Sequence, residues 1–252
     1  MDTVNADYVQ ACRVSGTLYG LPQMRDMAMG AGAYCIGQEY LDGIGFDYTS
    51  MYEDPENPDI IYTDYETLDN IFAQLHEKYP DKYVFAISDN MIGQGTIVDS
   101  VGGDYFGVLL DPANSLQVEN LFTSDIFKET CQRVYEWNQK GYISQDAVTN
   151  DTALSAQVKS GSYMSMMAQA KPGYSTQISG ECGRPMVVFQ VEPDIMKSSA
   201  VTGILWHLNQ GCEDPIAAMQ LLNAFYTDPE LSNLIIWGEE GTDYIVTEDG
   251  HI

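Results

Sequence analysis

Apolar residues recur at helical spacing in several stretches of the chain, and short apolar runs lie between them. The clearest helical stretches close the chain, where Asp214-Pro215 and Asp228-Pro229 each open one. Asp accepts a hydrogen bond from an otherwise unpaired backbone N–H, and Pro at the first helical position has no N–H to leave unpaired. Gly238 is expected to end the second helix in a left-handed conformation. This pattern predicts a helical hairpin followed by a turn that carries Trp237 and Tyr244.

A capping box predicts another helix near the start of the chain. In Thr63-Asp-Tyr-Glu66 the Thr accepts a hydrogen bond and the Glu reaches back to the cap. The helix should run to about Lys78, with Leu68, Ile71, Phe72 and Leu75 on one face, and Pro80 should end it. A short apolar run at 83–87 then predicts a buried strand. Helix followed closely by strand is the alternation that builds parallel or mixed α/β sheets.

The remaining pattern completes an α/β order. Ser124 is expected to cap a helix that ends at Gly141 and has Phe127, Cys131, Val134 and Tyr135 on its apolar side, so Cys131 is expected in the core. Asp151 begins a shorter helix that stops at Gly161. Loops are expected at 43–62 and 88–104, and further strands are expected at 105–110, 163–168, 186–191 and 201–208.

Charge and cysteine usage exclude several classes of function. The formal net charge of −26 repels phosphate backbones and anionic headgroups, so nucleic-acid binding is not expected. No apolar run is long enough for a transmembrane helix, and the N-terminus lacks the basic and apolar regions of a signal peptide. The five cysteines and three histidines are scattered, so neither a zinc site nor a full disulfide framework is expected, and no cofactor is indicated.

Four segments in a fixed order resemble a known family. Gly16-Thr-Leu-Tyr19-Gly20-Leu-Pro22 is similar to the Gly-x-x-Tyr-Gly-x-Pro segment of the extracellular solute-binding proteins of ABC importers. Residues 33–47 resemble that family's next strand and helix, residues 158–167 resemble its Lys-x-Gly helix end and strand, and residues 200–244 resemble its return to the first lobe. The nearest branch is the lipoprotein-type branch of sugar importers. The resemblance spans nearly the whole chain.

The resemblance implies an α/β fold of the type II periplasmic-binding-protein-like class, with two lobes joined by a hinge. Residues 1–33 would form part of lobe one and the hinge crossing, residues 34–194 lobe two, and residues 195–252 the returning strand and the helical part of lobe one. Family members begin with a signal peptide, a lipid-modified cysteine and further strands, so the chain is expected to be truncated at both ends, with lobe one incomplete. Cys12 is not a lipid-anchor cysteine, because no apolar run precedes it.

The family's function implies capture of a carbohydrate, in particular an oligosaccharide, or of a similar polar solute. Permease subunits of an ABC importer would be the protein partners. The full-length protein would be extracytoplasmic and would touch the membrane only through a lipid anchor. Sugars stack their C–H faces on aromatic rings and need well-placed donors and acceptors. The predicted ligand-binding residues, each weighed against plain packing or surface pairing, are Tyr19, Arg25, Asp26, Tyr163, Trp206, Trp237 and Glu240.

Two other functions stay open at this point. A secreted carbohydrate-active enzyme would need a pair of carboxylates, but 37 acidic residues supply such a pair by chance. No Gly-x-Ser-x-Gly elbow is present, and the proximity of Cys212 to His207 has no further support. The preferred prediction is therefore that the chain is not an enzyme. A surface protein that reports ligand to a receptor is the third possibility.

Overall fold

The computed structural model describes residues 4–23, 28–87, 95–101 and 104–247. The chain divides into two compact units. The first unit comprises residues 1–25 and 200–252, and the second unit comprises residues 26–199. Strand β4 starts at Ala28 and belongs to the second unit, so residues 28–33, assigned above to lobe one, lie in the sheet of the second unit.

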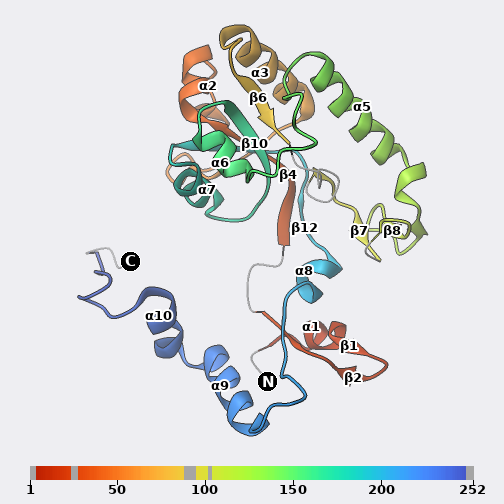
Figure 1. Ribbon diagram of the computed structural model, residues 1–252, viewed down its shortest axis with the longest axis vertical. Helices are drawn as coiled ribbons and strands as arrows, with labels where there is room; N and C mark the ends of the chain where they lie inside the picture. Colours follow the sequence, from red (N-terminus) through yellow and green to blue (C-terminus); the bar gives the residue numbers. More distant parts are fainter. Residues whose placement is uncertain (1–3, 24–27, 88–94, 102–103, 248–252) are drawn as a thin grey trace. The chain divides into compact units, whose positions relative to one another are not determined.

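A mixed sheet with the strand order β5-β11-β4-β10-β6 forms the centre of the second unit (Figure 1). Strand β4 runs antiparallel to both of its neighbours, whereas β10 is parallel to β6 and β11 is parallel to β5. Strand β12 pairs with the first residues of β4. The strands are β4 (Ala28–Gly37), β5 (Ile60–Tyr62), β6 (Tyr83–Ala86), β10 (Tyr163–Ala170), β11 (Met186–Gln190) and β12 (Asp194–Met196).

Helices cover both faces of this sheet, because β4 alternates its side chains between two cores. Tyr34 and Ile36 enter one core together with side chains of α2, α3 and α5, whereas Ala33 and Cys35 enter the other together with side chains of α6 and α7. The helices are α2 (Gln38–Ile44), α3 (Tyr65–Lys78), α5 (Asp125–Gln139), α6 (Leu154–Lys159) and α7 (Tyr174–Cys182). A short three-stranded sheet of β7 (Asp99–Ser100), β8 (Val108–Leu109) and β9 (Val118–Glu119) precedes α5. The 3₁₀ turns are η1 (Thr49–Met51) and η2 (Leu121–Thr123).

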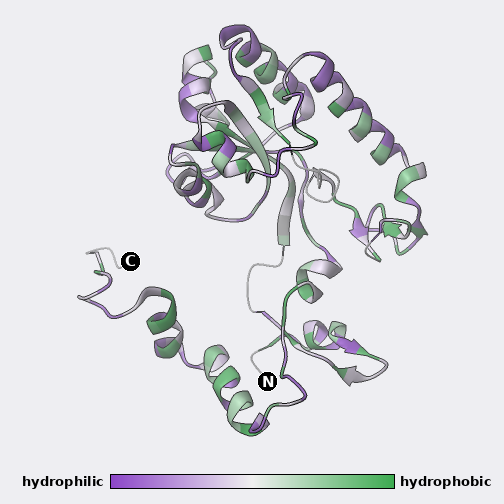
Figure 2. Cartoon of the chain, viewed as in Figure 1, coloured by the Kyte–Doolittle hydropathy of each residue, from purple (hydrophilic) through white to green (hydrophobic). Residues whose placement is uncertain are grey.

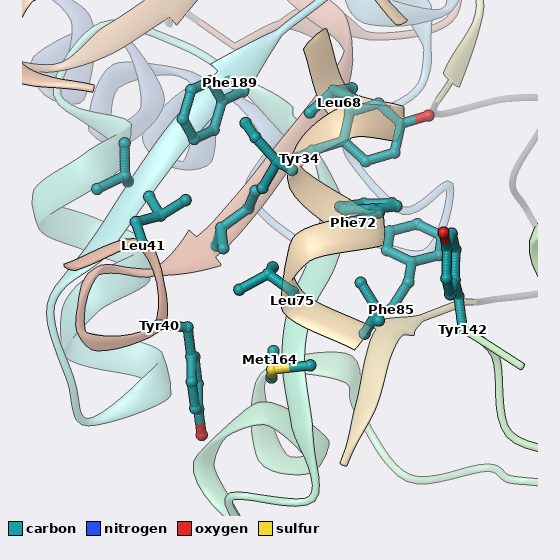
Figure 3. Close-up of a cluster of buried hydrophobic side chains, with 14 of the residues drawn as sticks. Tyr34, Tyr40, Leu41, Leu68, Phe72, Leu75, Phe85, Tyr142, Met164 and Phe189 are labelled. Atoms are coloured by element: carbon teal, nitrogen blue, oxygen red, sulfur yellow. The ribbon is translucent and has the colours of Figure 1, made fainter. Parts of the chain in front are cut away.

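The larger core is rich in aromatic rings. Figure 3 shows Phe72 and Leu75 of α3 beside Tyr34 and Phe85. The Phe72 ring lies 5.2 Å from that of Trp137 and 5.7 Å from that of Phe85, centroid to centroid. Such edge-to-face and tilted pairs add to the free energy of burial. The indole N–H of Trp137 donates to Asp69 Oδ1 at 2.7 Å, so this fully buried ring leaves no unpaired donor.

The first unit is built from short elements. Its hairpin joins β1 (Arg13–Val14) to β2 (Thr17–Leu18) through Ser15 and Gly16, which both have positive φ, as the twist of a two-residue hairpin favours. The pair β3 (Leu21–Pro22) and β13 (Leu205–Trp206) is antiparallel. The helices are α1 (Ala6–Ala11), α8 (Ser198–Thr202, whose last residues reach this unit), α9 (Pro215–Thr227) and α10 (Pro229–Trp237). Figure 2 shows hydrophobic residues over much of α9 and α10, whereas α3 and α5 alternate hydrophobic and hydrophilic stretches.

The predicted helical hairpin is confirmed. Asp214 accepts from Ala217 N and Asp228 from Glu230 N and Leu231 N, and each helix has Pro at its start. Gly238 does follow the last helical residue, but the predicted left-handed conformation is wrong. Its φ of 84° and ψ of −150° lie in a region that essentially only Gly occupies. The side chain of Asp243 fills the space where a Cβ of residue 238 would lie.

The structure corrects two predicted helix features in the second unit. Asp64, not Thr63, caps α3. The helix begins at Tyr65, one residue later than predicted, and the Asp64 carboxylate accepts a hydrogen bond from Thr67 N at 2.8 Å. The four predicted core residues of that helix are all buried. Cys131 and Tyr135 of α5 are exposed, since the helix packs through Trp137 instead, one turn beyond Arg133.

Two predicted strands are also wrong in part. Residues 201–208 begin in α8, and only Leu205–Trp206 form a strand, since pairing with β3 extends no further. In 105–110 only Val108–Leu109 are extended, and Tyr105 has a φ of 60°. The predicted loop at 88–104 contains β7, while its residues 88–94 and 102–103 lie outside the described residues.

Candidate functional site

The predicted ligand-binding residues fall into both units. Tyr19, Trp206 and Trp237 lie in the first unit, with 63%, 47% and 50% of their surface exposed, and Glu240 is also exposed there. Tyr163 lies in the second unit and is buried. Arg25 and Asp26 lie outside the described residues. All seven roles stay predictions, and no single unit brings the described five together.

The Tyr19-Gly20-Leu-Pro22 segment has a definite structural reason for its glycine. A Cβ at Gly20 would lie 2.9 Å from Leu205 Cβ, closer than real Cβ atoms approach other atoms, and 3.0 Å from Trp206 O, which is also a tight contact. The absence of a side chain therefore lets β13 pair with β3, and this pairing sets Trp206 opposite Leu21. Tyr226 of α9 donates to Pro22 O at 2.6 Å and ties the helix to the same pair. The β3–β13 pair therefore positions both Trp206, which lies in β13, and Tyr19, which lies two residues before β3.

Trp237 and Glu240 flank a turn that is closed by hydrogen bonds. Glu239 N donates to Asp243 Oδ2 at 2.9 Å, and Gly241 N donates to Tyr244 O at 2.7 Å. Glu240 and Tyr244 form an isolated bridge. The turn holds Trp237 at the end of α10 and Glu240 three residues later on a constrained backbone.

Polar side chains gather at one end of the central sheet in the second unit, where sequence analysis placed no site residue. The parallel strands β5 and β11 both finish here, and β4 starts here, because Asp194 pairs with Gly30 and Met196 with Ala28. We call this end the carboxyl edge and define it by Tyr62, Tyr65, Arg133, Gln190, Glu192, Asp194 and Lys197. In open α/β sheets, ligands bind outside the carboxyl ends of the strands.

Tyr62, Gln190 and Asp194 form a hydrogen-bonded group at the carboxyl edge. Tyr62 OH donates to Asp194 Oδ2 at 3.2 Å, and Gln190 Nε2 donates to Asp194 Oδ1 at 2.9 Å and to Glu192 O at 2.8 Å. The Oε1 atom of Gln190 is buried and has no hydrogen-bond partner in the described part of the chain. Gly30 makes room for this amide, since a Cβ there would overlap it. Asp194 is thus held by two donors from separate strands, and Tyr62 next to it is 47% exposed.

Charged groups surround this hydrogen-bonded group. The guanidinium of Arg133 lies 3.4 Å from the centroid of the Tyr65 ring, a cation–π contact between α5 and α3. Burial raises the pKa of the Glu192 carboxyl, and the nearby Arg133 and Lys197 partly offset this effect. Burial likewise lowers the pKa of Lys197, and the charges of Asp99 and Glu192 oppose the shift. Lys197 Nζ donates to Thr96 O at 2.6 Å, and Ser198 Oγ donates to Asp99 Oδ2 at 2.7 Å.

The carboxyl edge combines exposed aromatic surface with carboxylate acceptors and cationic donors. Such a set suits a polar, hydroxyl-rich ligand. A signal for it existed in the sequence, since polar residues 190, 192 and 194 directly follow a buried apolar run. Within the described residues, no group of three or more His, Cys, Asp or Glu side chains is arranged to hold a metal ion. No helix in that part of the chain is long and apolar enough to cross a membrane.

Comparisons with known proteins place this geometry in context. No protein-family model matches the chain. A carbohydrate ABC transporter substrate-binding protein of Streptococcus pneumoniae is 22% identical over 238 residues, which are 94% of this chain and 46% of that protein. The chain thus spans about half the length of the curated relative that it matches.

Solved structures share the fold. The N-glycan transport solute-binding protein NgtS of Streptococcus pneumoniae matches with a TM-score of 0.81 and 22% identity over 98% of this chain and 52% of NgtS. Its complex with Man1GlcNAc matches with a TM-score of 0.77. The alginate-binding protein AlgQ2 matches with a TM-score of 0.55 and 14% identity, over 94% of this chain and 49% of AlgQ2.

These findings confirm the predicted fold class, and the Streptococcus pneumoniae relatives are transport proteins rather than enzymes. The chain is therefore similar in sequence to a carbohydrate ABC transporter substrate-binding protein, and it has the α/β fold of the type II periplasmic-binding-protein class.

Proposed function

We propose that the chain is the solute-binding part of an ABC importer that captures a carbohydrate, in particular an oligosaccharide, outside the cell. The observation that carries this proposal is the fold likeness to NgtS over 98% of the chain, together with the sequence relationship to a carbohydrate transporter protein. NgtS has been solved with Man1GlcNAc and with Man5GlcNAc, so mannose and N-acetylglucosamine oligosaccharides are the first ligands to test.

The carboxyl edge and the predicted aromatic residues supply the chemistry that such a ligand needs. Asp194 and Tyr62 offer hydrogen-bonding groups for sugar hydroxyls, and Trp206 offers half of its indole surface for stacking. Tyr19, Trp237, Glu240, Arg25 and Asp26 remain further candidates. Binding would use these groups without breaking a bond, so we expect no glycosidase activity.

The family's function also implies the protein's setting. We expect permease subunits as partners, an extracytoplasmic location and a lipid anchor on the full-length protein. Two companion permease genes beside the coding gene would support the importer over a surface sensor. Turnover of a chromogenic glycoside that one carboxylate substitution abolishes would instead favour an enzyme.

A thermal-denaturation screen with a panel of oligosaccharides tests the proposal. A ligand at 100 times its Kd adds about 2.7 kcal/mol to the free energy of unfolding, which raises Tm measurably. We expect a mannose- or N-acetylglucosamine-containing oligosaccharide to produce this shift. Asp194→Asn and Trp206→Ala should each reduce it, whereas Tyr135→Ala, an exposed tyrosine of α5 that is neither a predicted ligand-binding residue nor part of the carboxyl edge, should leave it unchanged. Stabilisation by peptides or amino acids and by none of the oligosaccharides would remove the carbohydrate assignment.

A further inference from the structure

A second polar pocket lies at the opposite end of the central sheet from the carboxyl edge. Strands β6 and β10 begin there with Tyr83 and Tyr163, which are paired in register, whereas the other end of β10, at Ala170, pairs with Gly30. Seven residue steps of strand separate Tyr163 from Ala170, and a strand rises about 3.3 Å per residue, so the two ends are roughly 23 Å apart. We call this site the amino-end pocket.

The amino-end pocket has the size and lining of a small-molecule site. Its volume is about 520 Å³, inside the range of roughly 300 to 1,000 Å³ that ligand pockets occupy. Its lining comprises seven hydroxyl or amide side chains, two tyrosines, one aspartate and one alanine. Among the described residues, no basic side chain lines it. This composition disfavours phosphorylated or carboxylated ligands, which need cationic partners.

Two tyrosine rings form the aromatic wall of this pocket. The rings of Tyr83 and Tyr163 lie 5.3 Å apart at an interplanar angle of 32°. Tyr163 is buried, and Tyr83 is 39% exposed, so Tyr163 supports a ring that still has open surface. Neither hydroxyl has a hydrogen-bond partner in the described part of the chain.

The polar rim is held in place, yet it keeps unused hydrogen-bonding groups. Gln157 Nε2 donates to Thr152 O at 2.7 Å, Thr152 N donates to Asn150 Oδ1 at 3.0 Å, and Ser144 Oγ donates to the Asp146 carboxylate. The side-chain amide of Gln145 and the hydroxyl of Ser162 have no hydrogen-bond partner among the described residues. A rim whose backbone is already ordered loses little conformational entropy when a ligand binds.

We propose that the amino-end pocket is a second binding site, distinct from the carboxyl edge, for a neutral, hydroxyl-rich ring such as a monosaccharide or the terminal unit of a glycan. An aromatic face beside several uncharged donors and acceptors is the arrangement that recognises such a ring. This proposal does not depend on the importer function, since it rests only on residues of the pocket.

A nuclear magnetic resonance titration of the ¹⁵N-labelled protein tests the second site. The probes are methyl α-mannoside, N-acetylglucosamine and galactose, with glucose 6-phosphate as the anionic control and choline as the cationic control. We expect at least one neutral sugar to cause saturable shifts in the amides of Tyr83, residues 144–146 and residues 162–163, and we expect none from glucose 6-phosphate. Shifts in Tyr62 and Asp194 report on the carboxyl edge and are scored separately.

Variants of the lining residues test whether the sugar binds in the amino-end pocket. Tyr83→Ala should weaken binding about tenfold through loss of the stacking surface, and the exposed Gln145→Ala should weaken it several-fold through loss of hydrogen bonds. Tyr135→Ala, which removes an exposed tyrosine from α5, should not change it. Saturable shifts from choline alone would overturn the proposal in favour of a cation site. The absence of saturable shifts in the pocket amides with every neutral sugar, at concentrations up to tens of millimolar, would overturn it outright.

Discussion

The two units bury their apolar residues very differently. In the second unit, all four apolar residues on the inner face of α3 are fully buried, and aromatic rings from three elements pack around Phe72. In the first unit, the closing helices α9 and α10 leave Ile216, Leu221, Ile235, Ile236 and Trp237 between 50% and 71% exposed. Of these two helices only Leu222 is buried. The more hydrophobic helices therefore bury fewer apolar residues, and hydrophobicity in the sequence does not by itself measure stabilisation, since only area removed from water contributes.

The largest expected effect comes from truncating the core of the second unit. Phe72→Ala should lower its free energy of unfolding by about 3 to 5 kcal/mol, because it removes buried surface and leaves a cavity. Ile235→Ala in α10, where 60% of the residue is exposed, should lower the free energy of unfolding of the first unit by less than about 0.5 kcal/mol. Urea unfolding of the second unit can be followed by Trp137 fluorescence in a Trp206→Phe/Trp237→Phe background, where Trp137 is the only tryptophan, and opening of the first unit by hydrogen exchange of the α9 and α10 amides. Equal losses from the two truncations would contradict the comparison.

Substitution of one glycine in each unit tests how tightly that unit is packed around it. Gly30→Ala would press a Cβ into the buried Gln190 amide, and Gly20→Ala would press one against Leu205. We expect each to destabilise its own unit by about 1 to 3 kcal/mol through overpacking. Gly180→Ala is the control. It lies in α7 with open space around its Cβ, so it should stabilise the second unit by about 0.5 to 1 kcal/mol. Hydrogen exchange of the β4 and β13 amides assigns each change to its unit.

A smaller effect tests how the first unit is held together. Tyr226→Phe removes the hydroxyl that donates to Pro22 O and should cost about 0.5 to 1.5 kcal/mol. We expect faster hydrogen exchange in α9 and in the β3–β13 pair, with no change in α3. An effect on α3 as large as that on α9 would mean that the two units unfold together.

The smallest predicted effect concerns the Glu192 carboxyl. Burial raises its pKa above the value in the unfolded chain, so the folded state binds the proton more tightly. Its contribution to the free energy of unfolding therefore falls as the pH rises through the unfolded value, about 4.3, towards the folded one. Glu192→Gln should make the protein more stable at pH 7 and should have little effect below about pH 4. A Gln variant that is less stable at pH 7 would show that the attraction to the charges of Arg133 and Lys197 outweighs the cost of burial.

Local chemistry explains which elements could be predicted. The caps at Asp214 and Asp228 and the apolar face of α3 depend on residues within one helix, and the structure agrees with them. The strand predicted at 201–208 failed because β13 exists only where β3 pairs with it, more than 180 residues earlier. The prediction that Cys131 is buried was wrong for a related reason. Packing against the sheet and the hydrogen bond from Trp137 to Asp69 decide which face of α5 is buried, and Cys131 is exposed.

The sequence by itself determined the α/β order, the capped helices and the acidic character of this protein, because these follow from spacing and side-chain type over a few residues. Only the tertiary structure decided which polar residues meet. Tyr62 and Asp194 are 132 residues apart and share a hydrogen bond because β5 and β11 end together, and Tyr83 and Tyr163 form one wall because β6 and β10 begin together. Both sites depend on which distant strands pair with each other, and the pattern of a single segment does not show its pairing partner.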